Sequence, residues 1–184
     1  MENKRTALIV VGIAGVAGVV LLRRGLMNKI EGFVEDHKAY AKAVAKEYDL
    51  GDQAWKFILV QGAHESGYGL SGLTKKANNL FGFTGEYWEK IGKPVVRMMT
   101  SENIKGTETK MTRPFRRYAT TLDSMKDYAR LLTTKSNYKK AVEQLKAGNL
   151  QRAIDEMGRS GYATQPDYGA RLTRNLTEMS QYLA

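Results

Sequence analysis

The sequence predicts a mainly α-helical protein of the α+β class, with one small β-hairpin lobe and an N-terminal transmembrane helix. Apolar residues recur with a helical period along most of the chain after Gly25. One segment, residues 94–115, combines the β-branched pair Val95-Val96 with a turn-like Lys105-Gly106, which indicates a β-hairpin. Near the start, the run from Thr6 to Leu22 contains no charged residue.

This apolar run is the basis for an anchor over residues 1–24. As a helix it spans roughly 25 Å, the short end of what crosses a bilayer. A cleaved signal peptide is the alternative, but its apolar region is usually shorter and ends in small residues, whereas this run ends Leu21-Leu22-Arg23-Arg24. We therefore expect a retained anchor that contacts the lipid bilayer through residues 6–22. Basic pairs flank the run on both sides, so the positive-inside rule leaves the orientation of the anchor open. The spacing of its glycines does not predict an oligomeric state.

The rest of the chain, residues 25–184, is long enough for one domain with its own core but not for two. The absence of cysteine excludes disulfides and thiolate metal sites. With only two histidines a His-rich metal site is excluded as well, so we expect no metal and no cofactor.

The net charge of +10 favours anionic partners. Residues 1–24 carry four basic residues and one acidic residue, so the domain keeps +7. Its lysines and arginines are scattered instead of following one helix face, and we expect no binding of nucleic acid.

Within the domain the first helix is predicted over residues 28–48. Leu50-Gly51-Asp52 interrupts it, with Asp52 as the N-cap of a second helix that runs from Gln53 to Glu65. A glycine-rich loop over residues 67–79 and the hairpin follow.

The second half of the domain is predicted to be helical throughout. Thr120-Thr121-Leu122-Asp123 is typical of a capping box, which opens a helix that ends near Thr133. Shorter helices are expected over residues 137–147 and 149–157. The last helix is expected to start at residues 164–167 and to continue to Leu183.

Glu65 is the candidate catalytic residue. In helical register it continues a stripe formed by Trp55, Ile58 and Gly62, at the point where Gly67 ends the helix. Partial desolvation and the negative end of the helix dipole both raise the pKa of such a carboxyl group. A glutamic acid that stays protonated near neutral pH is what glycoside cleavage requires. The alternative is a solvated glutamate in the last turn, with glycines that serve only as C-caps.

Five segments extend the pattern around Glu65 and occur in one order over residues 40–184. They are Leu59–Ser71, Asn78–Phe83, Phe115–Tyr118, Ser124–Tyr128 and Tyr162–Tyr168. Together they resemble the glucosaminidase domain of glycoside hydrolase family 73, known from bacterial autolysins and the flagellar rod-assembly hydrolase. The resemblance implies a lysozyme-like fold.

The resemblance also implies roles for individual residues. Glu65 stands at the position of the family's catalytic acid. Glu102 resembles the second carboxylate, with Glu86, Glu89 and Glu108 as competitors nearby. Tyr162 matches the family's active-site tyrosine, for which a core aromatic role is the alternative. Gln165 stands where the family usually has an aspartate. We expect this difference to alter the cap of the last helix more than the catalytic chemistry.

Substrate-binding roles are expected for five further residues, Ser66, Tyr68, Asn79, Phe81 and Tyr118. Asn79 and Phe81 are expected to shape the floor of the cleft beneath the sugars. Ser66 resembles the motif serine but has no nearby base that would make it a nucleophile. His64 is expected to point away from the site, because it lies about 100° around the helix from Glu65.

The resemblance implies an endo-β-N-acetylglucosaminidase that hydrolyses β-1,4 bonds in the glycan strands of peptidoglycan. A lytic transglycosylase or a muramidase on the same fold is the first alternative. A catalytically silent membrane protein that grips the wall is the second. We expect the domain to be anchored to a membrane and to face the cell wall, in a bacterial envelope or a phage that carries a membrane.

Overall fold

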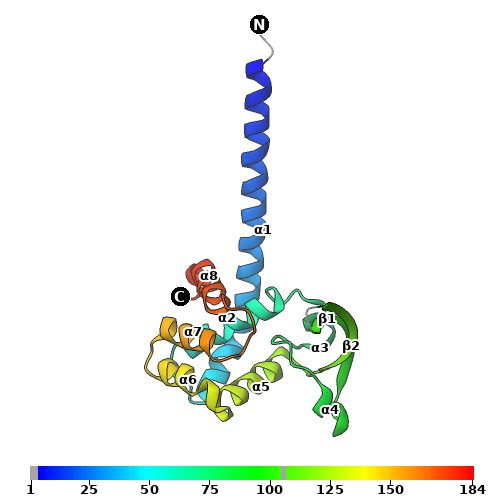
Figure 1. Ribbon diagram of the computed structural model, residues 1–184. Coiled ribbons are helices and arrows are strands. Elements are labelled where there is room, and N and C mark those ends of the chain that lie inside the picture. The colour runs from blue at the N-terminus through cyan, green and yellow to red at the C-terminus, as the bar shows by residue number, and fades with distance from the viewer. Residues whose placement is uncertain (1–3, 105–106) are drawn as a thin grey trace.

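The computed structural model describes the chain over residues 4–104 and 107–184, with side chains over residues 24–101 and 109–184. A long first helix, α1, projects from a helical body, and a two-stranded β-hairpin lies to one side of that body (Figure 1). The mainly helical class with one small β lobe is confirmed.

The elements follow one another along the chain in the order α1 to α4, β1, β2 and α5 to α8. Their bounds are α1 Lys4–Glu47, α2 Ala54–Ser66, α3 Gly72–Ala77, α4 Glu86–Lys90, β1 Val95–Ile104, β2 Thr107–Arg116, α5 Thr121–Thr134, α6 Lys139–Lys146, α7 Leu150–Arg159 and α8 Tyr168–Met179, with short 3-10 helices at Ser136–Tyr138 and Ser180–Tyr182.

Helix α1 crosses the expected boundary between anchor and domain without a break. Its C-terminal half is one of the core helices, and Ile30 is the first buried residue of the described side chains. Within the described part of the chain, no helix combines the length and the apolar character that a membrane span requires. The predicted anchor, residues 6–22, falls where the side chains lie outside the described residues.

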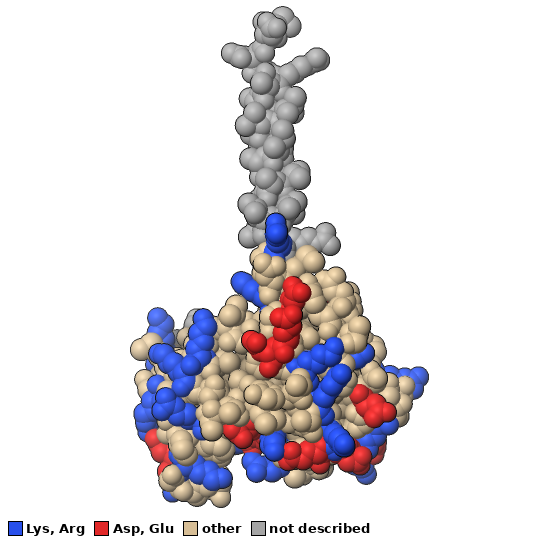
Figure 2. All heavy atoms as spheres, turned by 180° about the vertical axis from the view of Figure 1, so that it is seen from behind, with Lys and Arg blue, Asp and Glu red and all other residues tan. Residues whose placement is uncertain are grey.

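Basic and acidic side chains are interspersed over the surface of the domain. On the face shown in Figure 2, lysines and arginines are distributed over the whole domain surface, and aspartates and glutamates lie among them. This distribution agrees with the scattered charge in the sequence.

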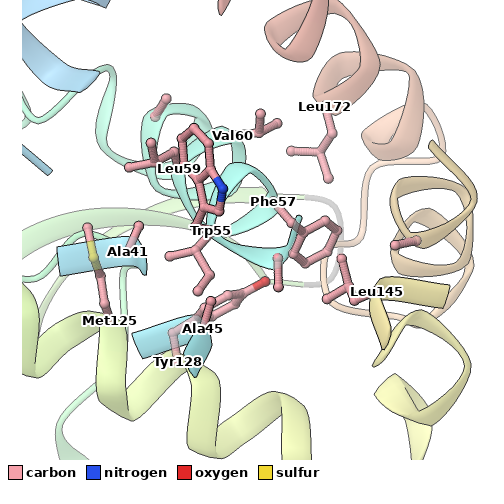
Figure 3. Close-up of a cluster of buried hydrophobic side chains, with 14 of the residues drawn as sticks. Ala41, Ala45, Trp55, Phe57, Leu59, Val60, Met125, Tyr128, Leu145 and Leu172 are labelled. Atoms are coloured by element: carbon pink, nitrogen blue, oxygen red, sulfur yellow. The ribbon is translucent and has the colours of Figure 1, made fainter. Parts of the chain in front are cut away.

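Helix α2 is the centre of the core. It is apolar almost all round, so its neighbours must cover it on several sides. Figure 3 shows its side chains among those of α1, α5, α6 and α8; the labelled residues are Ala41, Ala45, Trp55, Phe57, Leu59, Val60, Met125, Tyr128, Leu145 and Leu172. The position of α2 therefore fixes where its C-terminal end, and Glu65 with it, lies.

The hairpin is attached to the body at its base. Strands β1 and β2 are antiparallel, with Val95 opposite Arg116. The amide of Gly85 donates to the carbonyl of Pro114 at 2.7 Å, and the amide of Arg116 donates to the carbonyl of Phe83 at 3.0 Å. A Cβ atom on Gly85 would lie 2.9 Å from the backbone carbon of Phe115 in β2, so only glycine permits this close approach.

Several predicted boundaries differ from the observed ones. Asp52 is not the N-cap of α2, because the helix starts at Ala54 after a turn and Gln53 occupies the cap position. The predicted loop 67–79 contains α3, capped by the Ser71 hydroxyl, which accepts from the amide of Thr74 at 3.1 Å.

In the second half of the domain most predictions are confirmed. Thr120 and Asp123 form the predicted capping box of α5. Helices α6 and α7 lie where two short helices were expected. The last helix begins only at Tyr168, because the segment before it, which contains Pro166, forms turns.

A buried ionic cluster joins the end of the hairpin to α5. The Asp127 carboxylate is buried and accepts hydrogen bonds from the Tyr118 hydroxyl at 2.6 Å and from Arg116 at 2.6 Å, and it also pairs with Arg130. Burial alone would raise the pKa of Asp127, but the bonds from Tyr118, Arg116 and Arg130 outweigh it and hold the pKa below its usual value. Asp127 thus orders the point at which β2 leads into α5.

Replacement of Asp127 by alanine is expected to lower the free energy of unfolding by about 2–3 kcal/mol, because a partly buried arginine and a buried tyrosine lose their acceptor. Urea unfolding measures this change. Glu143→Gln is the control, because it removes the exposed Lys139–Glu143 pair and should cost less than about 0.5 kcal/mol. Equal losses in the two variants would contradict the assignment.

Candidate active site

Glu65 lies in the last turn of α2, which ends at Ser66. Gly67 follows in the left-handed conformation (φ 59°), and its amide donates to the carbonyl of Ala63. This cap turns the chain sharply away from the helix axis. As a result the side chain of Glu65 is half-buried at the edge of the core.

Helix α8 supplies the partner of Glu65. The Tyr168 hydroxyl donates to Oε1 of Glu65 at 2.7 Å. The same hydroxyl accepts a hydrogen bond from Nε2 of Gln61, also at 2.7 Å. Gln61 lies one helical turn before Glu65, so the ring of Tyr168 bridges two consecutive turns of α2.

The surroundings of Glu65 favour the protonated form. Burial raises the pKa of Glu65, and the hydrogen bond from Tyr168 lowers it in part, so that the net shift is upward. The direction agrees with the effect of desolvation that the sequence predicts. A carboxyl group of this kind can donate a proton closer to neutral pH than a free glutamic acid.

Four tyrosines from different parts of the chain gather beside this carboxyl group. Tyr162 stacks on Tyr168, with ring centroids 5.7 Å apart, and meets Tyr128 and Tyr138 edge-on at 6.2 and 6.0 Å. Burial and the charge of Glu65 both raise the pKa of Tyr162. Tyr162 is thus linked to Glu65 through its stack on Tyr168, and it is Tyr168 that makes the direct hydrogen bond.

Two predicted binding residues lie at the end of α2 and in the turn after it, and both make bonds within the protein. Ser66 is buried; its hydroxyl donates to the carbonyl of Gly62 at 2.5 Å and accepts from the amide of Gly69 at 2.7 Å. Tyr68 packs edge-on against Phe33, and its hydroxyl donates to Glu178 at 3.1 Å. Both side chains brace the turn that follows Glu65.

Asn79 and Phe81 lie near the hairpin base, in the segment between α3 and α4. The amide group of Asn79 is buried and bonds to the backbone of Phe83 and Arg116. Phe81 stacks on Tyr128, with centroids 4.2 Å apart. Asn79 thus supports the base of the hairpin, and Tyr118 extends this support through its bond to Asp127, whereas Phe81 belongs to the core.

Glu102 lies in the distal part of the hairpin, where the backbone register places it opposite Thr109. Its side chain, like that of its competitor Glu108, lies outside the described residues. The role of Glu102 as second carboxylate stays a prediction.

The other two competitors are engaged in ion pairs with the hairpin. Glu86 of α4 pairs with Arg113 at 2.5 Å, and Glu89 pairs with Arg97 through both carboxylate oxygens at 2.8 and 2.9 Å. Their carboxylates hold α4 against the strands. Over the described side chains, no group of three or more His, Asp or Glu residues is placed to hold a metal ion.

Gln61 and Tyr168 are the residues of this site that sequence reasoning missed. Tyr168 belongs to a matched segment, but the resemblance points to Tyr162 instead. A signal for Gln61 was available, because a polar residue four positions before Glu65 on an otherwise apolar helix lies on the same face. His64 contacts the Tyr168 ring edge-on, with centroids 5.4 Å apart, so it points toward α8.

A family model described as mannosyl-glycoprotein endo-beta-N-acetylglucosaminidase matches residues 38–181. The chain belongs to this glucosaminidase family. Membership confirms the resemblance that the five segments carry. The matched range contains α2, the hairpin and α8, and therefore the whole site around Glu65.

Relatives of this chain carry names that denote different activities. Exo-glucosaminidase LytG of Bacillus subtilis is 35% identical over 143 residues, which is 77% of this chain and 48% of that protein. Peptidoglycan hydrolase FlgJ of Pseudomonas aeruginosa is 31% identical over 70% of this chain and 32% of its own length. A probable N-acetylmuramidase of Lactococcus lactis is 33% identical over 82% of this chain and 34% of its own length. The chain thus spans from about a third to about a half of the length of these relatives.

Two solved structures of bacterial proteins share the fold. The catalytic domain of the autolysin Auto from Listeria monocytogenes matches with a TM-score of 0.70 and 26% identity, over 84% of this chain and 87% of that one. The glycoside hydrolase domain of FlgJ from Salmonella typhimurium, in a C-terminally truncated form, matches with a TM-score of 0.65 and 27% identity, over 83% and 98% of the two chains.

The raised pKa of Glu65 predicts a pH-dependent difference in stability. The folded protein binds this proton more tightly than the unfolded chain, so the stabilisation is complete below the ordinary glutamate pKa and is lost as the pH rises through the raised value. A glutamine at this position would be neutral at every pH and would still accept the Tyr168 bond. We therefore expect the melting temperature of Glu65→Gln to exceed that of the natural chain at pH 8, with a smaller excess at pH 4.

Thermal unfolding of the two proteins over pH 4–8 measures this difference, in which other titrating groups cancel. A difference that stays constant with pH would show that Glu65 ionises as a free glutamate does.

Proposed function

We propose that this chain hydrolyses β-1,4 glycosidic bonds in the glycan strands of peptidoglycan, as an endo-β-N-acetylglucosaminidase with Glu65 as the general acid. The observation that carries the proposal is the half-buried carboxyl of Glu65, whose raised pKa suits proton donation to a leaving sugar oxygen. The relatives LytG, an exo-glucosaminidase, and FlgJ, a peptidoglycan hydrolase, support the substrate class.

In this mechanism Glu65 protonates the glycosidic oxygen while positive charge develops on the sugar. Glu102 then either activates a water molecule or stabilises the charged sugar. If the two carboxyl groups lie about 6.5–9.5 Å apart, the configuration of the anomeric carbon is expected to be inverted. A separation of about 5–5.5 Å would imply that the configuration is retained. Participation of the sugar's own 2-acetamido group is the third route, with Tyr162 as a hydrogen-bond donor beside it.

The names of the relatives do not agree on which glycosidic bond is cut. They include an exo-glucosaminidase and a probable N-acetylmuramidase, and a lytic transglycosylase, which needs only one carboxyl group, is a further alternative. Mass spectrometry of borohydride-reduced digests distinguishes a glucosaminidase, a muramidase and a transglycosylase. We expect a reducing N-acetylglucosamine end; a reducing muramic acid end would indicate a muramidase, and an anhydro-muramic end a transglycosylase.

Glu65→Gln is expected to abolish clearing of a peptidoglycan zymogram, with a rate at least about a hundredfold lower, because the neutral amide cannot donate the catalytic proton. Glu143→Gln, an exposed change far along the chain, is the control and should clear normally. Clearing by Glu65→Gln would refute the assignment. A natural chain that binds the wall without clearing it would favour the silent wall-binding alternative.

We infer that residues 6–22 anchor the domain in a membrane, either of a bacterial envelope or of a phage that carries one, with the domain facing the wall. Helix α1 supports a short and stiff connection. Only residues 23–29 separate the apolar run from Ile30, the first buried residue, which is about 10 Å of helix. The domain would then act on glycan close to the membrane surface, and its charge of +7 would add a salt-sensitive attraction to the wall.

Fractionation after expression tests the anchor. The full chain is expected in the membrane pellet after alkaline carbonate washing and in the supernatant only after detergent. A variant with Val10, Ile13 and Val20 changed to aspartate is expected to shift to the soluble fraction, because each buried charge opposes insertion. Release of the full chain by carbonate alone would contradict the anchor and leave the activity at Glu65 unaffected.

A further inference from the structure

Gln61 is an unusual residue in the middle of an apolar helix. Its side chain is 0% exposed, and its neighbours on α2 are buried apolar residues. Its amide nitrogen donates to the Tyr168 hydroxyl at 2.7 Å, while its Oε1 has no hydrogen-bond partner among the described residues. An unpaired buried oxygen costs stability, so the amide is a poor choice for packing alone.

The direction of the hydrogen bonds follows from the number of protons on Tyr168. A tyrosine hydroxyl has one proton to donate and can accept as well. Because Gln61 donates into the Tyr168 oxygen, the single proton of Tyr168 is directed at Oε1 of Glu65. With the amide reversed, Tyr168 would donate to Gln61, and Glu65 would have to donate to Tyr168 to keep a bond.

This direction decides which oxygen of Glu65 holds the acid proton. In a carboxylic acid one oxygen acts as the acceptor and the other carries the proton. Oε1 is occupied as acceptor by Tyr168, so the proton belongs on Oε2, for which no bond to a described residue is found. In the reversed arrangement the proton would point at Tyr168 and away from a substrate.

We propose that Gln61 is a positioning residue that acts through Tyr168. By donating to the Tyr168 hydroxyl, it fixes the direction of the hydrogen bonds from Gln61 through Tyr168 to Glu65 and keeps the acid proton on Oε2, the oxygen left available to a leaving group. The inference rests on the proposed role of Glu65 as general acid. Neither Gln61 nor Tyr168, which is 2% exposed, is accessible to a sugar.

The test uses the full chain in detergent and measures the release of reducing ends from purified peptidoglycan as a function of pH. Gln61→Met removes the donor with little change of volume, and Tyr168→Phe removes the hydroxyl. Ser124→Ala is the matched control, because Ser124 is equally buried and bonds to the amide of Leu80, with no link to Glu65.

Both single variants are expected to lower kcat about tenfold, because the acid proton is no longer confined to Oε2, and to leave KM within about twofold. The basic limb of the pH profile, which reports the pKa of the acid, should move to higher pH in Tyr168→Phe, since loss of the Tyr168 bond removes an interaction that lowers this pKa. Gln61→Met should move it in the same direction by a smaller amount. The double variant should match Tyr168→Phe, because Gln61 acts only through Tyr168. Ser124→Ala should leave the limb in place.

A normal profile for Gln61→Met, or effects of the two changes on kcat that multiply in the double variant, would overturn the role of Gln61. Both results are meaningful only for variants with cooperative thermal unfolding, and Gln61→Leu or Tyr168→Leu gives a second set if either single variant does not fold. Activity in Glu65→Gln would overturn the acid assignment itself, and the role of Gln61 with it. An inactive Glu65→Gln together with a normal Gln61→Met overturns only the positioning role.

Discussion

The carboxyl group of Glu65 has to be held where water solvates it poorly. Helix α2 holds it there, and the rest of the structure packs around α2. A carboxyl group in bulk water would be ionised at neutral pH and unable to donate a proton. Helix α2 carries Glu65 out of the core on its last turn, and Gly67 then redirects the chain so that the helix end stays covered. Helices α1, α7 and α8 pack directly against α2, and side chains of α5 and α6 complete the core around it, which leaves the direction of α2 little freedom.

Two further arrangements serve the same end of α2. Helix α8 brings Tyr168 to the carboxyl group, and the aromatic group of Tyr128, Tyr138, Tyr162 and Tyr168 keeps its surroundings apolar but supplies hydroxyl groups. On the other side, Asn79 and Asp127 use buried polar groups to fix the base of the hairpin, which is otherwise attached to the body by a short edge. Rigid support on both sides of a reacting group is the usual requirement for precise placement of a substrate.

Much of this could be predicted from the sequence, where local signals are strong. The capping box at Thr120 and Asp123, the period of α2 and the β-branched pair Val95-Val96 at the start of β1 are encoded within a few residues. Helices α3 and α4 were missed because they are short and depend on tertiary partners: α4 has no buried residue and is held by the arginines of the hairpin. The direct partner of Glu65 was also missed, because it lies 103 residues away and the resemblance points to Tyr162 in the same matched segment. Ser66 bonds to the carbonyl of Gly62 one turn earlier in α2, whereas Asn79 also bonds to the carbonyl of Arg116, which only the fold brings near it.

The ionisation of Glu65 can be measured directly. A carbon-13 NMR titration of the full chain with labelled glutamate carboxyls, with the Glu65 signal assigned by its loss in Glu65→Gln, reports the pKa of this one group. The account predicts that the pKa of Glu65 lies above the ordinary value of a glutamic acid, because burial penalises its charged form. A Glu65 signal that titrates together with the exposed glutamates would contradict the central claim.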